Sequence, residues 1–161
     1  MDGRVCMLDV TKRSNGVLNK SATKESEETC ARFFECIREQ QYQIDPPTEQ
    51  FIYGGIYTRT VFIPKGCAVL GALIKIPTTC ILHGDVILSN GIDVVRSTGF
   101  ACYKGIPYRR CFAYALEDTY FTTHNPTKAT TIEEAEKEFT DEWYLLTTYK
   151  KRHNTTENNK K

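Results

Sequence analysis

Between Phe51 and Thr123 the sequence consists of short runs rich in β-branched and aromatic residues, separated by turn residues. Nowhere in this stretch does the apolar pattern follow the helical period, so the sequence predicts an all-β core. Roughly eight strands at this spacing favour a barrel or jelly roll, because such folds close or cover the edges that a single sheet exposes.

Turn residues mark the strand ends inside this core. Pro64-Lys65-Gly66 ends a strand that begins near Tyr57, and a second strand is expected from Ala68 to Ile74. Asn90-Gly91 lies between two apolar runs and predicts a two-residue hairpin, because both turn positions favour positive φ.

Helical patterns flank the core on both sides. Cys30, Phe33, Phe34 and Ile37 recur at helical spacing and predict one apolar stripe on an N-terminal helix. After the core, Thr130 and Glu133 are spaced as a capping box. The face of that second helix is expected to carry five apolar residues, Ile132, Ala135, Phe139, Trp143 and Leu146.

These patterns predict a single mainly β domain with a helix at each end, which suits a chain of 161 residues. The expected parts are an N-terminal arm (1–20), a helix (21–44), a barrel (48–125), a C-terminal helix (130–149) and a disordered tail (150–161).

Charge and cysteine content exclude several classes of function. A net charge of +1 gives no field that would attract long nucleic acid or a membrane. The sequence has no apolar run long enough to span a bilayer and no signal-peptide pattern, so we expect a cytosolic protein. The seven cysteines form no C-x-x-C pair, which argues against a disulfide framework and against a zinc knuckle.

The stretch from Gly55 to Gly66, followed by Val69-Leu70-Gly71, resembles a family of small cupin-like proteins carried by tailed bacteriophages. Tyr114 to His124 is similar to the last barrel strands of that family, and the acidic residues 132–136 agree with its following helix. The resemblance covers about residues 33–139 and implies a cupin-like β-barrel, with the cytoplasm of an infected host cell as the location.

The metal site that such cupins carry does not transfer to this sequence. Metal-binding cupins have an H-x-H pair just after the strand that here ends near Gly71, but residues 72–80 contain no histidine. We therefore expect no metal and no other cofactor. An alternative site would combine Cys80 and His83 with the thiolate of Cys102 or Cys111, whereas the simpler interpretation packs Cys80 inward and leaves His83 in a turn.

Two groups of residues are candidates for a functional site. His83 and His124 could converge at the barrel mouth as general acid and base, although a strand-end histidine bound to a backbone group is the simpler interpretation of His124. The densest basic and aromatic group comprises Tyr103, Lys104, Tyr108, Arg109 and Arg110, and these types bind phosphate and stack on bases.

Three functions remain open from the sequence. The first is a non-catalytic phage accessory protein that binds a small anionic or nucleotide-like ligand, in one form sequestering a nucleotide signal of host immunity. The second is a metal-independent nucleotide phosphodiesterase that uses His83 and His124. The third is a structural or virion-associated protein. In each case the apolar helix faces favour a homodimer.

Overall fold

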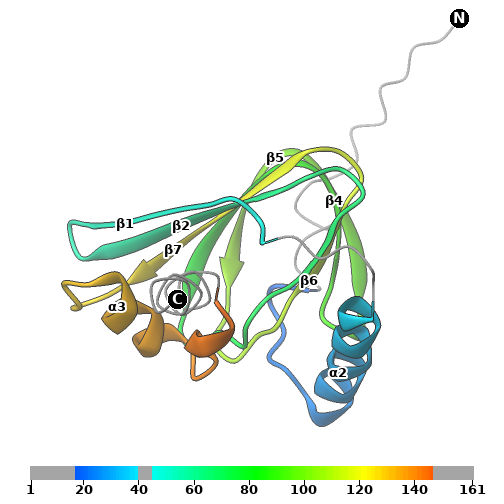
Figure 1. Ribbon diagram of the computed structural model, residues 1–161, viewed down its shortest axis with the longest axis horizontal. Helices are drawn as coiled ribbons and strands as arrows, with labels where there is room; N and C mark the ends of the chain where they lie inside the picture. Colours follow the sequence, from blue (N-terminus) through cyan, green and yellow to red (C-terminus); the bar gives the residue numbers. More distant parts are fainter. Residues whose placement is uncertain (1–16, 40–44, 147–161) are drawn as a thin grey trace, which may run out of the picture.

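The computed structural model describes residues 17–39 and 45–146, without the side chain of Ile37. Seven antiparallel strands form one curled sheet, with a helix on each side of it in the sequence (Figure 1). The strands are β1 (Thr48–Tyr53), β2 (Ile56–Ile63), β3 (Ala68–Leu70), β4 (Thr78–Ser89), β5 (Val94–Gly105), β6 (Phe112–Ala115) and β7 (Thr119–Pro126). The helices are α2 (Lys24–Arg38), α3 (Ile132–Phe139) and a short 3₁₀ helix, η1 (Trp143–Leu145). The predicted mainly β fold with two flanking helices is confirmed.

Strand β4 holds the sheet together because it pairs with three other strands. Its whole length pairs with β5, from Thr78 opposite Gly105 to Ser89 opposite Val94. On its other edge, the first half pairs with β7 and the second half pairs with β6. The sheet order β1-β2-β7-β4-β6-β3 therefore bends at β4, which gives the curled shape seen in Figure 1.

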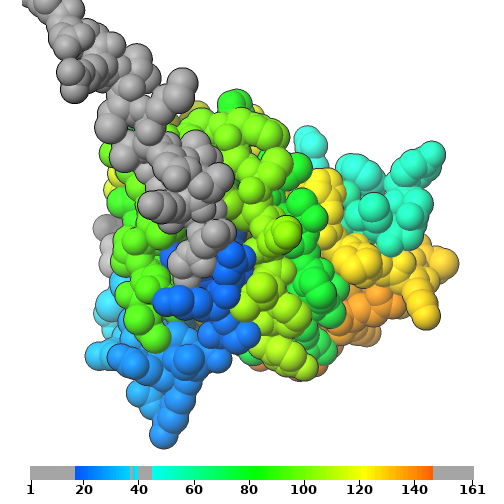
Figure 2. Space-filling model, turned by 180° about the vertical axis from the view of Figure 1, so that it is seen from behind, coloured from blue at the N-terminus to red at the C-terminus, as the bar shows by residue number. Residues whose placement is uncertain are grey.

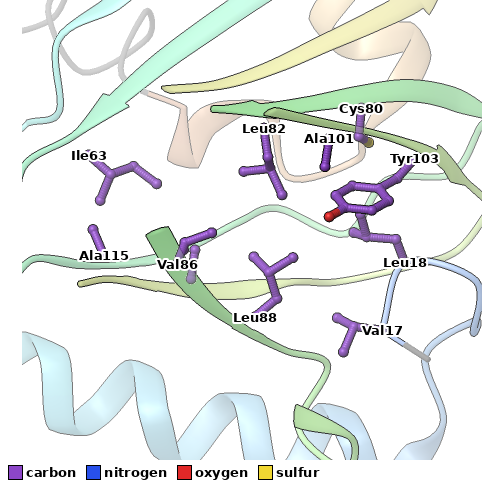
Figure 3. Close-up of a cluster of buried hydrophobic side chains, with 11 residues drawn as sticks. Val17, Leu18, Ile63, Cys80, Leu82, Val86, Leu88, Ala101, Tyr103 and Ala115 are labelled. Atoms are coloured by element: carbon purple, nitrogen blue, oxygen red, sulfur yellow. The ribbon is translucent and has the colours of Figure 1, made fainter. Parts of the chain in front are cut away.

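The inner face of the curled sheet carries the main core. Alternate residues of β4 point inward and are almost completely buried, as the two-residue period of a strand requires. The buried cluster comprises Val17, Leu18, Ile63, Cys80, Leu82, Val86, Leu88, Ala101, Tyr103, Ala113 and Ala115 (Figure 3).

Val17 and Leu18 enter this core from outside the sheet. Both are at most 1% exposed, and Figure 3 shows them beside Leu88 and Tyr103. The backbone carbonyl of Leu18 also accepts a hydrogen bond from the backbone N–H of Ile106, which follows β5 (3.1 Å). This end of the predicted N-terminal arm is therefore part of the domain core, and residues 1–16 lie outside the described residues.

A second, smaller core lies between the sheet and α3. Tyr57 is fully buried there and stacks on Phe139, with ring centroids 5.3 Å apart. Beside it, the guanidinium of Arg59 donates a hydrogen bond to the Glu136 carboxylate at 3.2 Å. Both charged side chains are nearly buried, so this ion pair holds α3 against β2.

The C-terminal helix is shorter than the sequence predicts. Helix α3 ends at Phe139, and the next residue, Thr140, is extended. Its side chain donates a hydrogen bond to the backbone carbonyl of Leu73, which directs the chain back to the sheet (2.8 Å). The capping box is also one residue later than predicted, since Thr131 and Glu134 exchange the two bonds.

Three further expectations need correction. The predicted strand from Ala68 to Ile74 ends at Leu70, and Ile74 forms only an isolated bridge with Arg109. The predicted two-residue hairpin is a four-residue loop, in which Gly91 has positive φ and the Asn90 side chain accepts bonds from two backbone N–H groups. The N-terminal helix ends at Arg38, while residues 40–44 and 147–161 lie outside the described residues.

None of the helices within residues 17–39 and 45–146 is long and apolar enough to cross a membrane.

Leu18→Ala tests whether the N-terminal segment is part of the core. Removing a fully buried leucine side chain should lower the free energy of unfolding by about 2–5 kcal/mol, because the surrounding core closes only partly around the cavity. Leu145→Ala is the matched control, since Leu145 is 39% exposed, and it should cost less than about 1 kcal/mol. Urea denaturation measures both, and equal effects would contradict the role assigned to Leu18.

Candidate functional site on the outer sheet face

The outer face of the sheet carries a row of rings that crosses four strands. Residues directly opposite one another in antiparallel strands point to the same side of the sheet. The register places Phe62 of β2 opposite Tyr120 of β7, Tyr120 opposite His83 of β4, and His83 opposite Phe100 of β5. We call these four residues the ring row. The rings of Phe62 and Tyr120 are in contact, with centroids 5.1 Å apart.

The ring row is open to solvent at its β5 end. Phe100 is 67% exposed and Tyr120 is 49% exposed, while His83 between them is also exposed. Large aromatic side chains left in water on one continuous surface commonly mark a binding site. The row is therefore the strongest candidate for a binding surface on this sheet.

A second row on the same face is polar. It runs from Thr58 through His124 and Thr79 to Lys104, again across β2, β7, β4 and β5. The Nδ1 atom of His124 and the hydroxyl of Thr58 share a hydrogen bond of 3.0 Å, so the imidazole is held in a fixed orientation. Thr79 and Lys104 are exposed. We call these four residues the polar row. The ammonium group of Lys104 in this row can bind an anion.

The two predicted catalytic histidines share this face but are not neighbours. His83 is opposite Tyr120, and His124 lies four positions farther along β7. At about 3.3 Å per residue, their positions are roughly 13 Å apart along the strands. A general acid and base must both reach one phosphodiester, so the structure does not bring this pair together for one reaction.

Arg109, a predicted ligand residue, points into the core and is 3% exposed. Its Nη1 atom donates hydrogen bonds to the backbone carbonyls of Ile106 and Ile76, at 2.8 and 3.3 Å. Its Nη2 atom donates to the hydroxyl of Thr78 and to the sulfur of Cys80. The side chain therefore fastens the segment after β5 to the start of β4.

Arg110 joins both ends of the described chain to the sheet. Its guanidinium donates hydrogen bonds of 2.9 to 3.1 Å to the carboxylate of Glu27 on α2, and of 2.6 and 2.9 Å to that of Glu142 near η1. Burial alone would lower the pKa of Arg110, but the hydrogen bonds to the two carboxylates outweigh it and raise the pKa above the usual arginine value. Arg110 is thus engaged inside the protein.

The three other residues of the predicted group lie in different surroundings. Tyr103 is buried, and its hydroxyl is 2.6 Å from that of Ser97. Tyr108 is 59% exposed and has a positive φ of 54°. Lys104 belongs to the polar row. Of the five predicted ligand residues, Lys104 alone shares a face with the two histidines.

The alternative metal site at Cys80 and His83 does not assemble. Cys80 and His83 are three positions apart along β4, so their side chains point to opposite faces: Cys80 inward and fully buried, His83 outward and exposed. His83 is paired on both sides within β4, so it does not lie in a turn. In residues 17–39 and 45–146 no three His, Cys, Asp or Glu side chains are grouped so that they could hold a metal ion.

Burial makes the inward cysteines poor nucleophiles. Desolvation, with a smaller contribution from the neighbouring Cys80, raises the pKa of Cys111 to about 12. The thiolate is the reactive form of cysteine, so Cys111 stays protonated near neutral pH.

No protein-family model matches the sequence. No curated protein matches it either. Solved structures are similar to part of the chain. They include ectoine synthase from P. lautus, at 13% identity and a TM-score of 0.43 over 58% of this chain and 75% of that one. KdgF from Halomonas sp. matches at 11% identity and a TM-score of 0.44, over 55% of this chain and 87% of that one.

A protein from Shewanella frigidimarina that contains a cupin-2 domain matches at 10% identity and a TM-score of 0.41, over 62% of this chain and 97% of its own. The likeness is one of strand arrangement over a little more than half of the chain. At such identities and TM-scores, the chemistry of these proteins does not transfer to this one.

Sequence patterns did not indicate the ring row. Phe62, Tyr120 and Phe100 belong to three strands that are far apart in the sequence. The pattern around each of them indicates a strand and nothing more specific. The one available signal is alternation within each strand, which separates two faces without saying which residues of different strands meet.

Arg110→Gln tests the contribution of the double ion pair. The change leaves the partly buried Glu27 and Glu142 carboxylates without their cation, so the free energy of unfolding should fall by roughly 2–4 kcal/mol. Arg96→Gln is the control, because the Arg96–Asp85 pair is exposed and should contribute less than about 1 kcal/mol. Chemical denaturation at neutral pH measures both, and similar losses would refute the assignment.

The contribution of Arg110 to the free energy of unfolding should also depend on pH. Burial raises the pKa of Glu142, but the hydrogen bond from Arg110 outweighs burial, and the folded-state pKa is below the usual value of a glutamate. Stability from such a carboxylate is present above its unfolded pKa and is lost as pH falls through the folded pKa. The difference in unfolding free energy between wild type and Arg110→Gln should therefore shrink below about pH 4. A constant difference from pH 7 to pH 3 would contradict this cause.

Proposed function

We propose that this chain is a non-catalytic binding protein that holds a small nucleotide-like anion on the outer face of its sheet. The observation that carries the proposal is the ring row lying parallel to the polar row on one face. Exposed aromatic rings stack on bases, and Lys104 offers a cation for phosphate.

The spacing of the two rows suggests the size of the ligand. Every member of the ring row lies four residues along its strand from a member of the polar row, for example Phe100 and Lys104 on β5. The rows are therefore roughly 13 Å apart. This separation suits a ligand with a base at one end and a phosphate at the other, such as a nucleoside triphosphate or a dinucleotide.

We propose binding without catalysis because of the geometry of the described residues. The two histidines are too far apart to act on one phosphodiester, and His124 is already bonded to Thr58. A ligand on this face would be held unchanged. The resemblance to bacteriophage proteins suggests a purpose: a phage accessory protein in the infected cell could sequester a nucleotide signal of host immunity by binding it.

Calorimetric titration tests the proposal with ATP and with cyclic di-AMP. Adenosine supplies the base without phosphate, and tripolyphosphate supplies the phosphates without a base. We expect ATP or the dinucleotide to bind more tightly than either fragment and to be recovered unchanged. If neither nucleotide binds at about 1 mM, the proposal is wrong.

Variants locate the site. Phe100→Ala and Tyr120→Ala should each weaken nucleotide binding by about 5- to 150-fold, because losing one base–aromatic stack costs roughly 1–3 kcal/mol. Lys104→Gln should weaken binding of the nucleotide but not of adenosine. Tyr144→Ala is the matched control, since Tyr144 is 50% exposed, nearly the same as Tyr120, and lies beyond α3 in η1. Unchanged binding in Phe100→Ala and Tyr120→Ala would place the ligand elsewhere.

A further inference from the structure

Strand β1 forms an edge of the sheet that is unprotected in the described structure. It pairs with β2, from Thr48 opposite Val61 to Tyr53 opposite Ile56, and within residues 17–39 and 45–146 no strand pairs with its other side. The β1–β2 hairpin projects from the body of the protein in Figures 1 and 2. Its turn is formed by Gly54 and Gly55, both with positive φ.

The alternation of backbone bonds shows which groups this edge presents. The backbone N–H of Phe62 donates to the carbonyl of Pro47, just before β1 (2.9 Å). In an antiparallel ladder the bonded residues alternate, so Phe51 and Tyr53 bond to β2 while the N–H and C=O groups of Thr48 and Ile52 point away from it. A second strand is the structural element that satisfies such a row of donors and acceptors.

Strand β1 lacks several of the usual protections of an edge strand. β1 contains no proline and no lysine, and its register with β2 runs for six pairs without a bulge. Its outer side is apolar at this end: Tyr53 is 82% exposed, Phe51 57% and Ile56 44%. Glu49 is the one charged residue that β1 adds to this surface.

We propose that β1 pairs antiparallel with β1 of a second copy of this chain, around a two-fold axis through Phe51. Each copy then offers the same edge to the other, which meets the self-complementarity that a two-fold interface requires. Phe51 of one copy lies against Phe51 of its partner on the outer face, and Tyr53 lies against Glu49 of the partner subunit. The two sheets become one continuous sheet.

The size of this contact sets the strength of the dimer. The contact consists of the paired backbone together with Phe51 and Tyr53, whose side chains point off the outer face and would be covered only in part. Stable interfaces commonly bury about 800 Å² per partner. We therefore expect a weak dimer with a dissociation constant of roughly 10 µM.

Sedimentation velocity on the full chain tests the pairing. Wild type should change from monomer to dimer as its concentration rises through about 10 µM. Phe51→Lys places two ammonium groups at the two-fold axis and should raise the dissociation constant at least tenfold. Phe100→Lys is the control, since Phe100 is a comparably exposed aromatic on the far strand β5, and it should leave the dimer intact. A monomeric wild type, or a dimer unaffected by Phe51→Lys, overturns the proposal.

A cysteine pair tests the register directly. With Cys6, Cys36 and Cys102 changed to Ser, Phe51→Cys should form a disulfide-linked dimer under mild oxidation, because opposite residues of this kind bring their Cβ atoms within about 4.5–5.5 Å. Tyr53→Cys lies opposite Glu49 of the partner subunit in this register and should stay unlinked. Linking through Tyr53→Cys but not through Phe51→Cys would refute the two-fold axis at Phe51.

The two surfaces can be told apart. Phe51 lies directly opposite Thr58 of the polar row, so Phe51→Lys is scored on the dimer alone. Nucleotide binding is scored with Phe100→Ala, which should weaken it and leave the dimer intact because β5 does not pair with β1 in the sheet. Failure of one proposal therefore leaves the other standing.

Discussion

The two-residue period of strand β4 is the constraint on which the rest of the structure depends. This strand is paired along both edges, so its side chains have only two directions to take. Inward residues such as Leu82 and Val86 form the core, and outward residues such as His83 form the candidate binding face. A slip of one residue in this register would exchange the two faces, burying His83 and exposing Leu82.

The same constraint explains which parts of the fold the sequence could predict. Runs of β-branched and aromatic residues, turn residues and helical periods are local properties of the sequence. They identified the β core, the two helices and most strand positions. Where prediction was wrong, a tertiary contact overrode the local pattern. The C-terminal helix keeps an apolar helical period to Leu146, yet it stops at Phe139, because Thr140 bonds to Leu73 and turns the chain back to the sheet.

The candidate site shows a deeper limit of single-sequence reasoning. Arginine and tyrosine close together in the sequence indicated one ligand site, but the strand and its following loop distribute these residues among different environments. Arg109 and Tyr103 face the core, Arg110 joins two carboxylates, and Lys104 faces outward. Composition reports which residues can bind an anion, whereas burial and internal partners decide which of them are available to do so.

The inner and outer faces of this sheet therefore have different roles. Val17 and Leu18 fill the inner side together with residues of β4 and β5, so the space between the curled strands is occupied by the protein's own side chains. The outer face and the edges are therefore the surfaces on which we place the proposed sites. The outer face offers rings beside hydroxyl, imidazole and ammonium groups, and β1 offers backbone donors and acceptors. We assign the first set to the proposed small aromatic anion and the second to the proposed strand pairing, and the two surfaces adjoin where Phe51 lies opposite Thr58.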